Sequence, residues 1–66
     1  MKYVLQRERN GATEYLAQVY SEKYEFKVKV TTDRKEVTPM GRSLADRTLA
    51  ILAQSGEYFE LKEVAE

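Results

Sequence analysis

The sequence predicts an α+β fold in which four strands and one helix follow in the order βββαβ. Three observations carry this prediction: an Asn-Gly pair between two apolar segments, a strictly alternating segment at residues 24–31, and one amphipathic stretch that ends at Ser55-Gly56. The chain has 66 residues, of which 42% are hydrophobic, and we expect a single small domain over residues 1–66.

The first two strands are expected at residues 2–8 and 14–20, on either side of Asn10-Gly11, a dipeptide typical of hairpin turns. A two-residue turn there would place Leu5 opposite Leu16 and divide the apolar side chains between both faces. A three-residue loop at residues 9–11, with Gly11 at positive φ, instead pairs Leu5 with Tyr15. We expect this second register, because it gathers on one face Tyr3, Leu5, Tyr15, Ala17 and Val19.

A third strand is expected at residues 24–31, after a short polar link at residues 21–23. Its apolar side chains alternate strictly with polar ones, so one face is expected to be buried and the other exposed. The apolar members are Tyr24, Phe26, Val28 and Val30. Residues 33–41 contain turn-forming residues and are expected to form one long connection.

A single helix is expected to begin at Ser43, which has Asp46 three residues later as in a capping box, or at Thr38, which precedes Pro39. Ser55-Gly56 is expected to end it, since glycine tolerates the left-handed conformation found there. The helix side that faces the sheet is expected to carry Leu44, Ala45, Thr48, Leu49 and Leu52, with Ile51 at its margin. A fourth strand is expected at residues 58–64, where the two-residue alternation returns.

The helix is expected to cover one face of a mostly antiparallel sheet with the strand order 3-2-1-4. The first strand has a continuous apolar run, Tyr3–Leu5, which suits a central position. Because a helix separates the third and fourth strands, the fourth is expected to run parallel to the first and third.

The composition excludes several kinds of chemistry. The chain has no Cys and no His, so it offers no thiolate or imidazole to a metal ion or to nucleophilic catalysis. It contains no P-loop, G-x-G-x-x-G or G-x-S-x-G motif. We therefore expect no enzyme, no cofactor, no metal and no small-molecule substrate.

No membrane contact is expected either. The longest apolar run, residues 49–53, is far shorter than the ~20 residues of a membrane span. The N-terminus has no apolar stretch like that of a signal peptide. A cytoplasmic location is the expectation that follows.

The side of the sheet away from the helix is expected to bind a partner. Alternation places on it Val4, Leu16, Tyr20, Tyr58 and Val64. Five apolar or aromatic side chains exceed what a solvated face needs, and tyrosine is frequent in interfaces. The sequence therefore predicts a non-enzymatic interaction module that binds itself or another protein, although a partly apolar open face on a monomer is also compatible with the pattern.

A basic segment supports an alternative function. It consists of Lys23, Lys27, Lys29, Arg34 and Lys35, close to Tyr20. Lysines beside an aromatic side chain can hold single-stranded nucleic acid through phosphate contacts and base stacking. The 11 acidic residues balance the 11 basic ones, however, and lysines on an edge strand also protect it against aggregation. Weak nucleic-acid binding therefore remains the second prediction.

Two segments carry a resemblance to a known class of proteins. Lys2-Tyr3-Val4-Leu5 forms an opening strand, and residues 59–64 form a strand that follows the helix at the end of the chain. In this plan the chain resembles small uncharacterised accessory proteins of bacteriophages and prophages. The resemblance implies a protein that acts by binding a host or phage macromolecule, and it implies no particular site residues.

Overall fold

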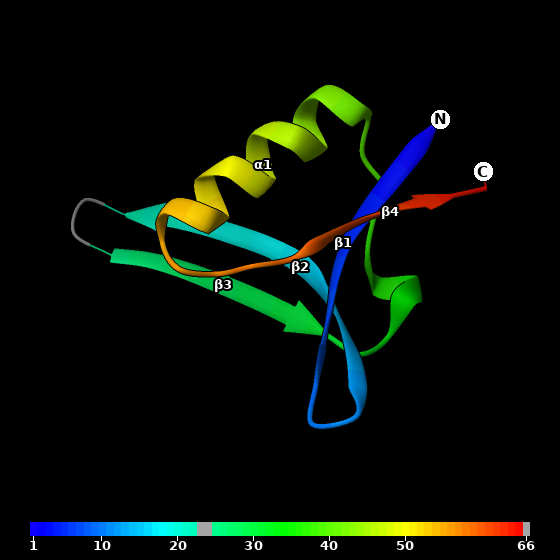
Figure 1. Cartoon of the computed structure of the whole chain (residues 1–66), viewed down its shortest axis with the longest axis horizontal. Helices are drawn as coiled ribbons and strands as arrows, with labels where there is room; N and C mark the ends of the chain where they lie inside the picture. Colours follow the sequence, from blue (N-terminus) through cyan, green and yellow to red (C-terminus); the bar gives the residue numbers. More distant parts are fainter. Residues whose placement is uncertain (23–24, 66) are drawn as a thin grey trace.

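The computed structural model describes residues 1–22 and 25–65 and, within these, the side chains outside residues 21–26. Its elements are β1 (Lys2–Arg9), β2 (Ala12–Glu22), β3 (Glu25–Thr31), the 3-10 turn η1 (Arg34–Glu36), α1 (Arg42–Gln54) and β4 (Glu60–Val64). The strands form one antiparallel sheet in the order β3-β2-β1-β4, and α1 packs on it (Figure 1). The predicted α+β class, element order and strand order are confirmed.

The first hairpin closes through a two-residue turn. Asn10 and Gly11 both have positive φ, 54° and 79°. Gln6 pairs with Tyr15 across the hairpin. Two consecutive positive φ values are typical of a type I′ turn, whose twist matches that of antiparallel strands. The positive φ of Gly11 is therefore confirmed, whereas the expected three-residue loop and the pairing of Leu5 with Tyr15 are wrong.

A β-bulge in β2 explains why this register keeps the apolar residues together. The pairing of β2 with β3 shifts between Leu16 and Gln18, which leaves Ala17 as an extra residue in β2. An extra residue moves the side-chain alternation by one position. Leu16 before the bulge and Val19 after it consequently both pack in the core against the helix.

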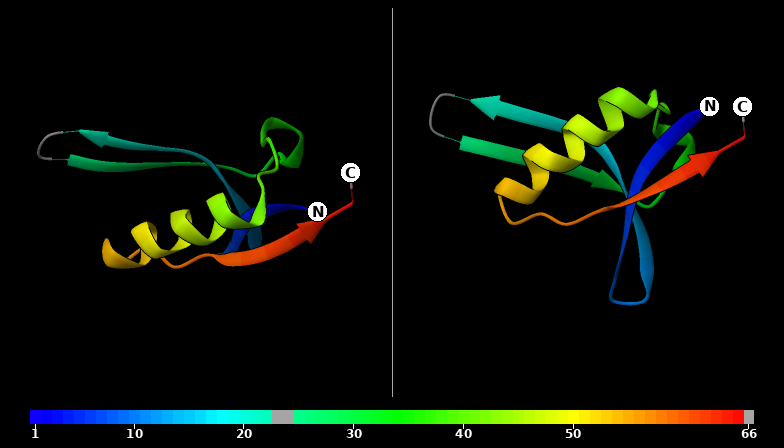
Figure 2. Two further views of the ribbon diagram at one scale, coloured as in Figure 1. Left: turned by 90° about the horizontal axis from the view of Figure 1, so that it is seen from above. Right: turned by 45° about the horizontal axis from the view of Figure 1, so that its top comes forward.

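β4 runs antiparallel to β1, with Leu5 opposite Leu61 and Gln6 opposite Glu60. The expected parallel direction is wrong because it assumed a flat sheet. Figures 1 and 2 show that β3 and β4 do point in roughly the same direction in space. The sheet is strongly twisted between β2–β3 and β1–β4. Because of this twist, β4 points roughly along β3 and still runs antiparallel to its neighbour β1.

The helix begins where the preceding chain leaves the sheet. Met40 pairs with Tyr3 of β1 through two backbone hydrogen bonds of 2.8 Å. α1 starts two residues later at Arg42, and no side chain caps its first turn. Both predicted starts, Thr38 and Ser43, are therefore wrong. The predicted end is confirmed, since Gly56 follows the helix with a φ of 81°.

The core lies between α1 and the sheet. Its buried cluster consists of Tyr3, Leu5, Leu16, Ala45 and Leu52. Around it pack the half-buried Val19, Val28, Met40, Leu49, Phe59 and Leu61. Ala45, Leu49 and Leu52 face the sheet as predicted. Within the described residues, no helix has the length and apolar character needed to cross a membrane.

Candidate interaction surfaces

The predicted partner surface is not exposed as a unit. Leu16 is only 4% exposed and lies in the core on the helix side, because the register set by the two-residue turn reverses its expected orientation. Val4 lies outside that cluster but is only 1% exposed. Neither side chain can contact a partner in the folded chain, so the prediction is wrong for both. Tyr20 and Tyr58 are exposed, and Val64 is half-buried.

Part of the sheet side away from α1 is covered by the connection between β3 and α1. Val4 and Val37 are the buried apolar side chains outside the core cluster in the described residues, and Val37 belongs to this connection. Thr31 donates a hydrogen bond to Glu36 at 3.1 Å, and Arg34 donates one to the carbonyl of Val37 at 3.0 Å. In the left view of Figure 2, the segment that contains η1 lies above β1 and apart from most of α1. The sheet is therefore less open than its single helix suggested.

Two of the predicted basic residues do lie beside an aromatic side chain. Lys27 is opposite Tyr20, and Lys29 is opposite Gln18, in the pairing of β2 with β3. Both lysines are exposed. The Tyr20 hydroxyl donates a hydrogen bond of 2.7 Å to the Gln18 side chain, which holds the ring on this side of the hairpin. Tyr20, Lys27 and Lys29 thus form one surface.

The other members of the basic segment do not extend this surface in a simple way. Arg34 is half-buried and its guanidinium is directed to the carbonyl of Val37. Lys35 is exposed, but it lies in η1, whose first turn is capped by the Asp33 carboxylate. Lys23 lies outside the described residues. The structure therefore supports a smaller basic surface than the sequence predicted.

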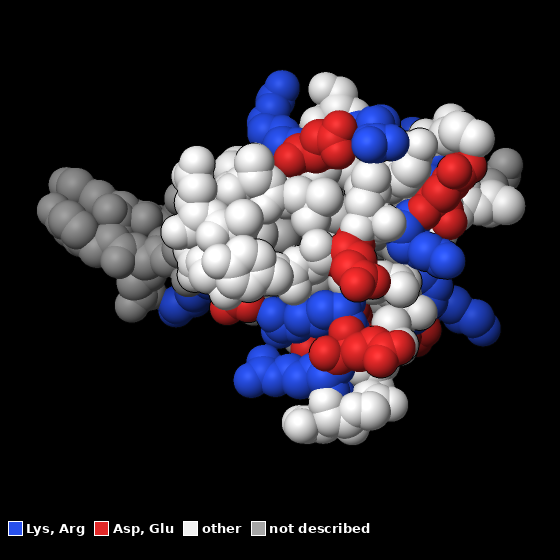
Figure 3. Space-filling model, in the orientation of Figure 1, with Lys and Arg blue, Asp and Glu red and all other residues white. Residues whose placement is uncertain are grey.

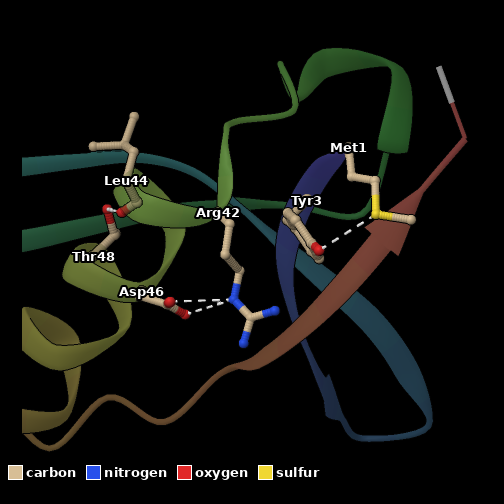
Figure 4. Close-up of polar contacts among 6 residues, drawn as sticks. All are labelled: Met1, Tyr3, Arg42, Leu44, Asp46 and Thr48. Atoms are coloured by element: carbon tan, nitrogen blue, oxygen red, sulfur yellow. Dashed lines mark hydrogen bonds and ion pairs between the residues drawn. The ribbon is translucent and has the colours of Figure 1, made fainter.

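A surface that the sequence analysis missed lies on the helix. Leu44 and Ile51, expected in the core stripe, are 53% and 44% exposed. With the half-buried Thr48 between them, they follow the i, i+4, i+7 spacing of one helix side. The Thr48 hydroxyl donates a hydrogen bond of 2.8 Å to the Leu44 carbonyl (Figure 4) and so leaves its methyl group for contact. We call Leu44, Thr48 and Ile51 the helix stripe.

Among the described residues, the charged side chains of α1 all lie in its N-terminal half. Arg42 lies 3.1 Å from the Asp46 carboxylate and 5.3 Å from the ring centroid of Tyr3. In Figure 4 these groups lie on a different side of α1 from Leu44. Residues 48–56 contain no charged side chain, and Figure 3 shows a continuous uncharged surface over the C-terminal half of the helix. This uncharged run was the sequence signal that could have indicated the stripe.

Arg7 occupies the centre of a polar network beside an open hollow. The hollow has a volume of about 540 Å³ and is lined by Gln6, Arg7, Glu8, Tyr58, Phe59 and Glu60. Arg7 contacts the carboxylates of Glu57 at 2.7 Å and Glu14 at 3.0 Å, and lies 4.6 Å from the ring centroid of Phe59. The hydrogen bond to Glu57 raises the pKa of Arg7, against an opposing effect of burial, and Glu14 raises it further. This guanidinium pairs with two carboxylates of its own chain and joins β1, β2 and the segment before β4.

The described residues contain no group of three or more His, Cys, Asp or Glu side chains placed to hold a metal ion. Two carboxylate residues line the hollow, Glu8 and Glu60, while Arg7 beside them pairs with Glu57 and Glu14. Comparisons with protein-family models, with curated proteins and with solved structures find no match to this chain.

Proposed function

We propose that this chain is a small, non-enzymatic interaction module that binds a partner protein through the helix stripe. The observation that carries the proposal is the pair Leu44 and Ile51, two large apolar side chains exposed two helical turns apart, with the Thr48 hydroxyl between them donating to the Leu44 carbonyl. Isolated exposed apolar residues are common, but an apolar row along one helix side is a recurrent way to dock against another protein.

The energetics indicate what the partner must look like. About half of each of the two side chains is already buried, so covering the rest contributes ~1.5–3 kcal/mol in total. A micromolar complex needs about 8 kcal/mol, so the partner must also cover the flanks of the stripe. Arg47 is exposed beside it and has no ion-pair partner in the described part of the chain. The partner chemistry that fits is an apolar face bordered by a carboxylate.

Affinity capture from the native host tests this function when the variants are matched for charge. Leu44→Glu with Ile51→Glu places two carboxylates on the stripe, whereas Ala53→Glu with Gln54→Glu places two on exposed positions elsewhere on α1. The identified partner should bind the parent and the control variant and lose at least tenfold in affinity for the stripe variant. Equal affinity for both variants, with both folded by circular dichroism, would exclude the helix stripe as the binding site.

The surface of Tyr20, Lys27 and Lys29 favours a second candidate function, weak binding of single-stranded nucleic acid. The Tyr20 ring, with Lys27 opposite it and Lys29 opposite the Gln18 to which its hydroxyl donates, offers one base-stacking position beside two positive charges. Retention of oligonucleotides that falls steeply with salt, and that is lost in Tyr20→Ser, would support it. A cytoplasmic location and the role of a phage or prophage accessory protein are part of the first proposal, in which the chain binds a partner protein.

A further inference from the structure

The outer edge of β4 is an open edge of the sheet. β4 is the last strand in the order β3-β2-β1-β4 and, in the described residues, pairs with β1 alone. An edge strand presents unpaired backbone N–H and C=O groups that can pair with another strand. Tyr58, just before the strand, is 72% exposed, and Glu60 and Lys62 are exposed within it. Neither charged group has an ion-pair partner in the described part of the chain.

The residues of this edge are complementary to themselves. If two copies of β4 pair antiparallel around a two-fold axis at Leu61, Leu61 meets Leu61 and Glu60 meets Lys62 twice. The same register brings Tyr58 opposite Val64, an aromatic and a β-branched side chain, and Phe59 opposite the exposed Glu63. Opposite charges and aromatic–aliphatic pairs directly across two strands stabilise a sheet. All members of each pair lie on the same side of the extended sheet, as the two-residue alternation requires.

The neighbouring registers are not complementary. Centring the axis on Lys62 opposes the two copies of Lys62, and centring it on Glu60 or Glu63 opposes two carboxylates. A shift by one residue between the strands would place each side chain opposite one that points to the other side of the sheet. The charge pattern of β4 therefore selects the register centred on Leu61.

The centre of the other edge strand is less complementary to itself. Around the centre of β3, an axis at Val28 opposes Lys27 and Lys29 twice, and an axis at either lysine opposes that lysine with itself. Like charges directly opposite each other destabilise strand pairing. An axis nearer the start of the strand, at Phe26, would instead place Glu25 opposite Lys27. The lysines therefore disfavour the central registers of β3.

We infer that two copies of this chain pair through β4 around a two-fold axis at Leu61 and join their four-stranded sheets into one. The contact uses neither the helix stripe nor the surface around Tyr20, so it is independent of the proposed function. Its stability comes from the backbone ladder, from two symmetric ion pairs between Glu60 and Lys62, and from the cover of Tyr58 by Val64.

Charge reversal tests the pairing. Sedimentation over a concentration series should show the parent moving from 7.7 kDa towards twice that mass. Glu60→Lys and Lys62→Glu should each weaken dimerisation by about tenfold or more, since two attractive pairs become repulsive. The double variant Glu60→Lys with Lys62→Glu should restore the parent affinity. The stripe variant Leu44→Glu with Ile51→Glu should dimerise like the parent, which separates this contact from the proposed function.

A disulfide experiment tests the register. The chain has no cysteine, so Glu60→Cys and Lys62→Cys each carry a single exposed thiol. Residues directly opposite in antiparallel strands lie about 4.5–5.5 Å apart between Cα atoms, within the range of a disulfide. An oxidised mixture of the two variants should give mainly the mixed dimer, whereas Lys35→Cys should remain unlinked. A parent that stays monomeric at millimolar concentration, a dimer insensitive to both charge reversals, or a statistical mixture of disulfides would overturn the inference.

Discussion

Replacing Leu16 by Ala distinguishes the observed register from the one expected from the sequence pattern. Leu16 is 4% exposed in the core cluster with Leu5 and Leu52. Truncating a buried leucine to alanine typically costs ~2–5 kcal/mol, because transfer energy is lost and a cavity remains. A domain of this length has a total stability of about 3–10 kcal/mol. The variant is therefore expected to melt at a much lower temperature or to be unfolded at room temperature.

The matched control is the variant Tyr15→Ala. Tyr15 precedes Leu16 in β2, points to the other side of the sheet and is half-buried. Thermal melts of both variants, followed by circular dichroism, should show a far larger loss for Leu16→Ala. One kcal/mol corresponds to about 4–8 °C in Tm for a domain of this size. If Tyr15→Ala were the more damaging change and Leu16→Ala melted like the parent, the three-residue loop would be right and the core described above wrong.

Two further predictions concern the first hairpin and its network. Gly11→Val should lower the free energy of unfolding by ~1–2 kcal/mol through backbone strain alone, because φ is 79° and no atom lies within 4 Å of the position that a Cβ would take. Gly11→Asn is the control: asparagine tolerates positive φ, so its urea midpoint should stay close to that of the parent. Arg7→Gln should lower the free energy of unfolding by ~1–3 kcal/mol, because it leaves Glu14 and Glu57 without their shared cation. Arg7→Lys should recover part of that loss. Equal urea midpoints for Arg7→Gln and the parent would show that the network contributes nothing to stability.

The elements of the fold could be predicted because each is encoded locally. The alternation at residues 24–31 requires only the two-residue period of a strand, and Ser55-Gly56 requires only the left-handed φ of a helix end. The strand order also followed, because the apolar run in β1 needs neighbours on both sides. These signals depend on a few adjacent residues, so a single sequence carries them.

The register could not be predicted because distant residues decide it. The alternation alone disfavours a two-residue turn, because continued regular pairing beyond Leu5 and Leu16 would set Tyr3 opposite Gln18 and divide the apolar side chains between both faces. In the structure, Tyr3 pairs with Met40 instead of β2, and the bulge at Ala17 corrects the alternation further along. Neither feature has a local signature. The direction of β4 failed for a related reason, because the twist of the sheet accumulates over all its strands.

The exposed surfaces differ from the predicted ones for the same physical reasons. The register error placed Leu16 outside the core, and the connection through Val37 covers the side on which Val4 lies. The helix pattern predicts one broad apolar side, but a single helix on a small twisted sheet buries only a narrow row, centred on Ala45 and Leu52. Leu44 and Ile51, at the border of that row, are left exposed. An amphipathic helix whose apolar side is broader than its contact with the sheet therefore indicates a second contact.

The two edges of the sheet together explain why self-association through β4 would stop at a dimer. Pairing of β4 with β3 of another copy would leave a free β4 edge and a free β3 edge at the ends, and could continue without limit. Pairing around a two-fold axis consumes both β4 edges at once. The edges that remain are two copies of β3, where Lys27 and Lys29 disfavour the antiparallel register centred on Val28. The lysines that make β3 a candidate for nucleic-acid binding would thus also disfavour extension of the open sheet at its other end.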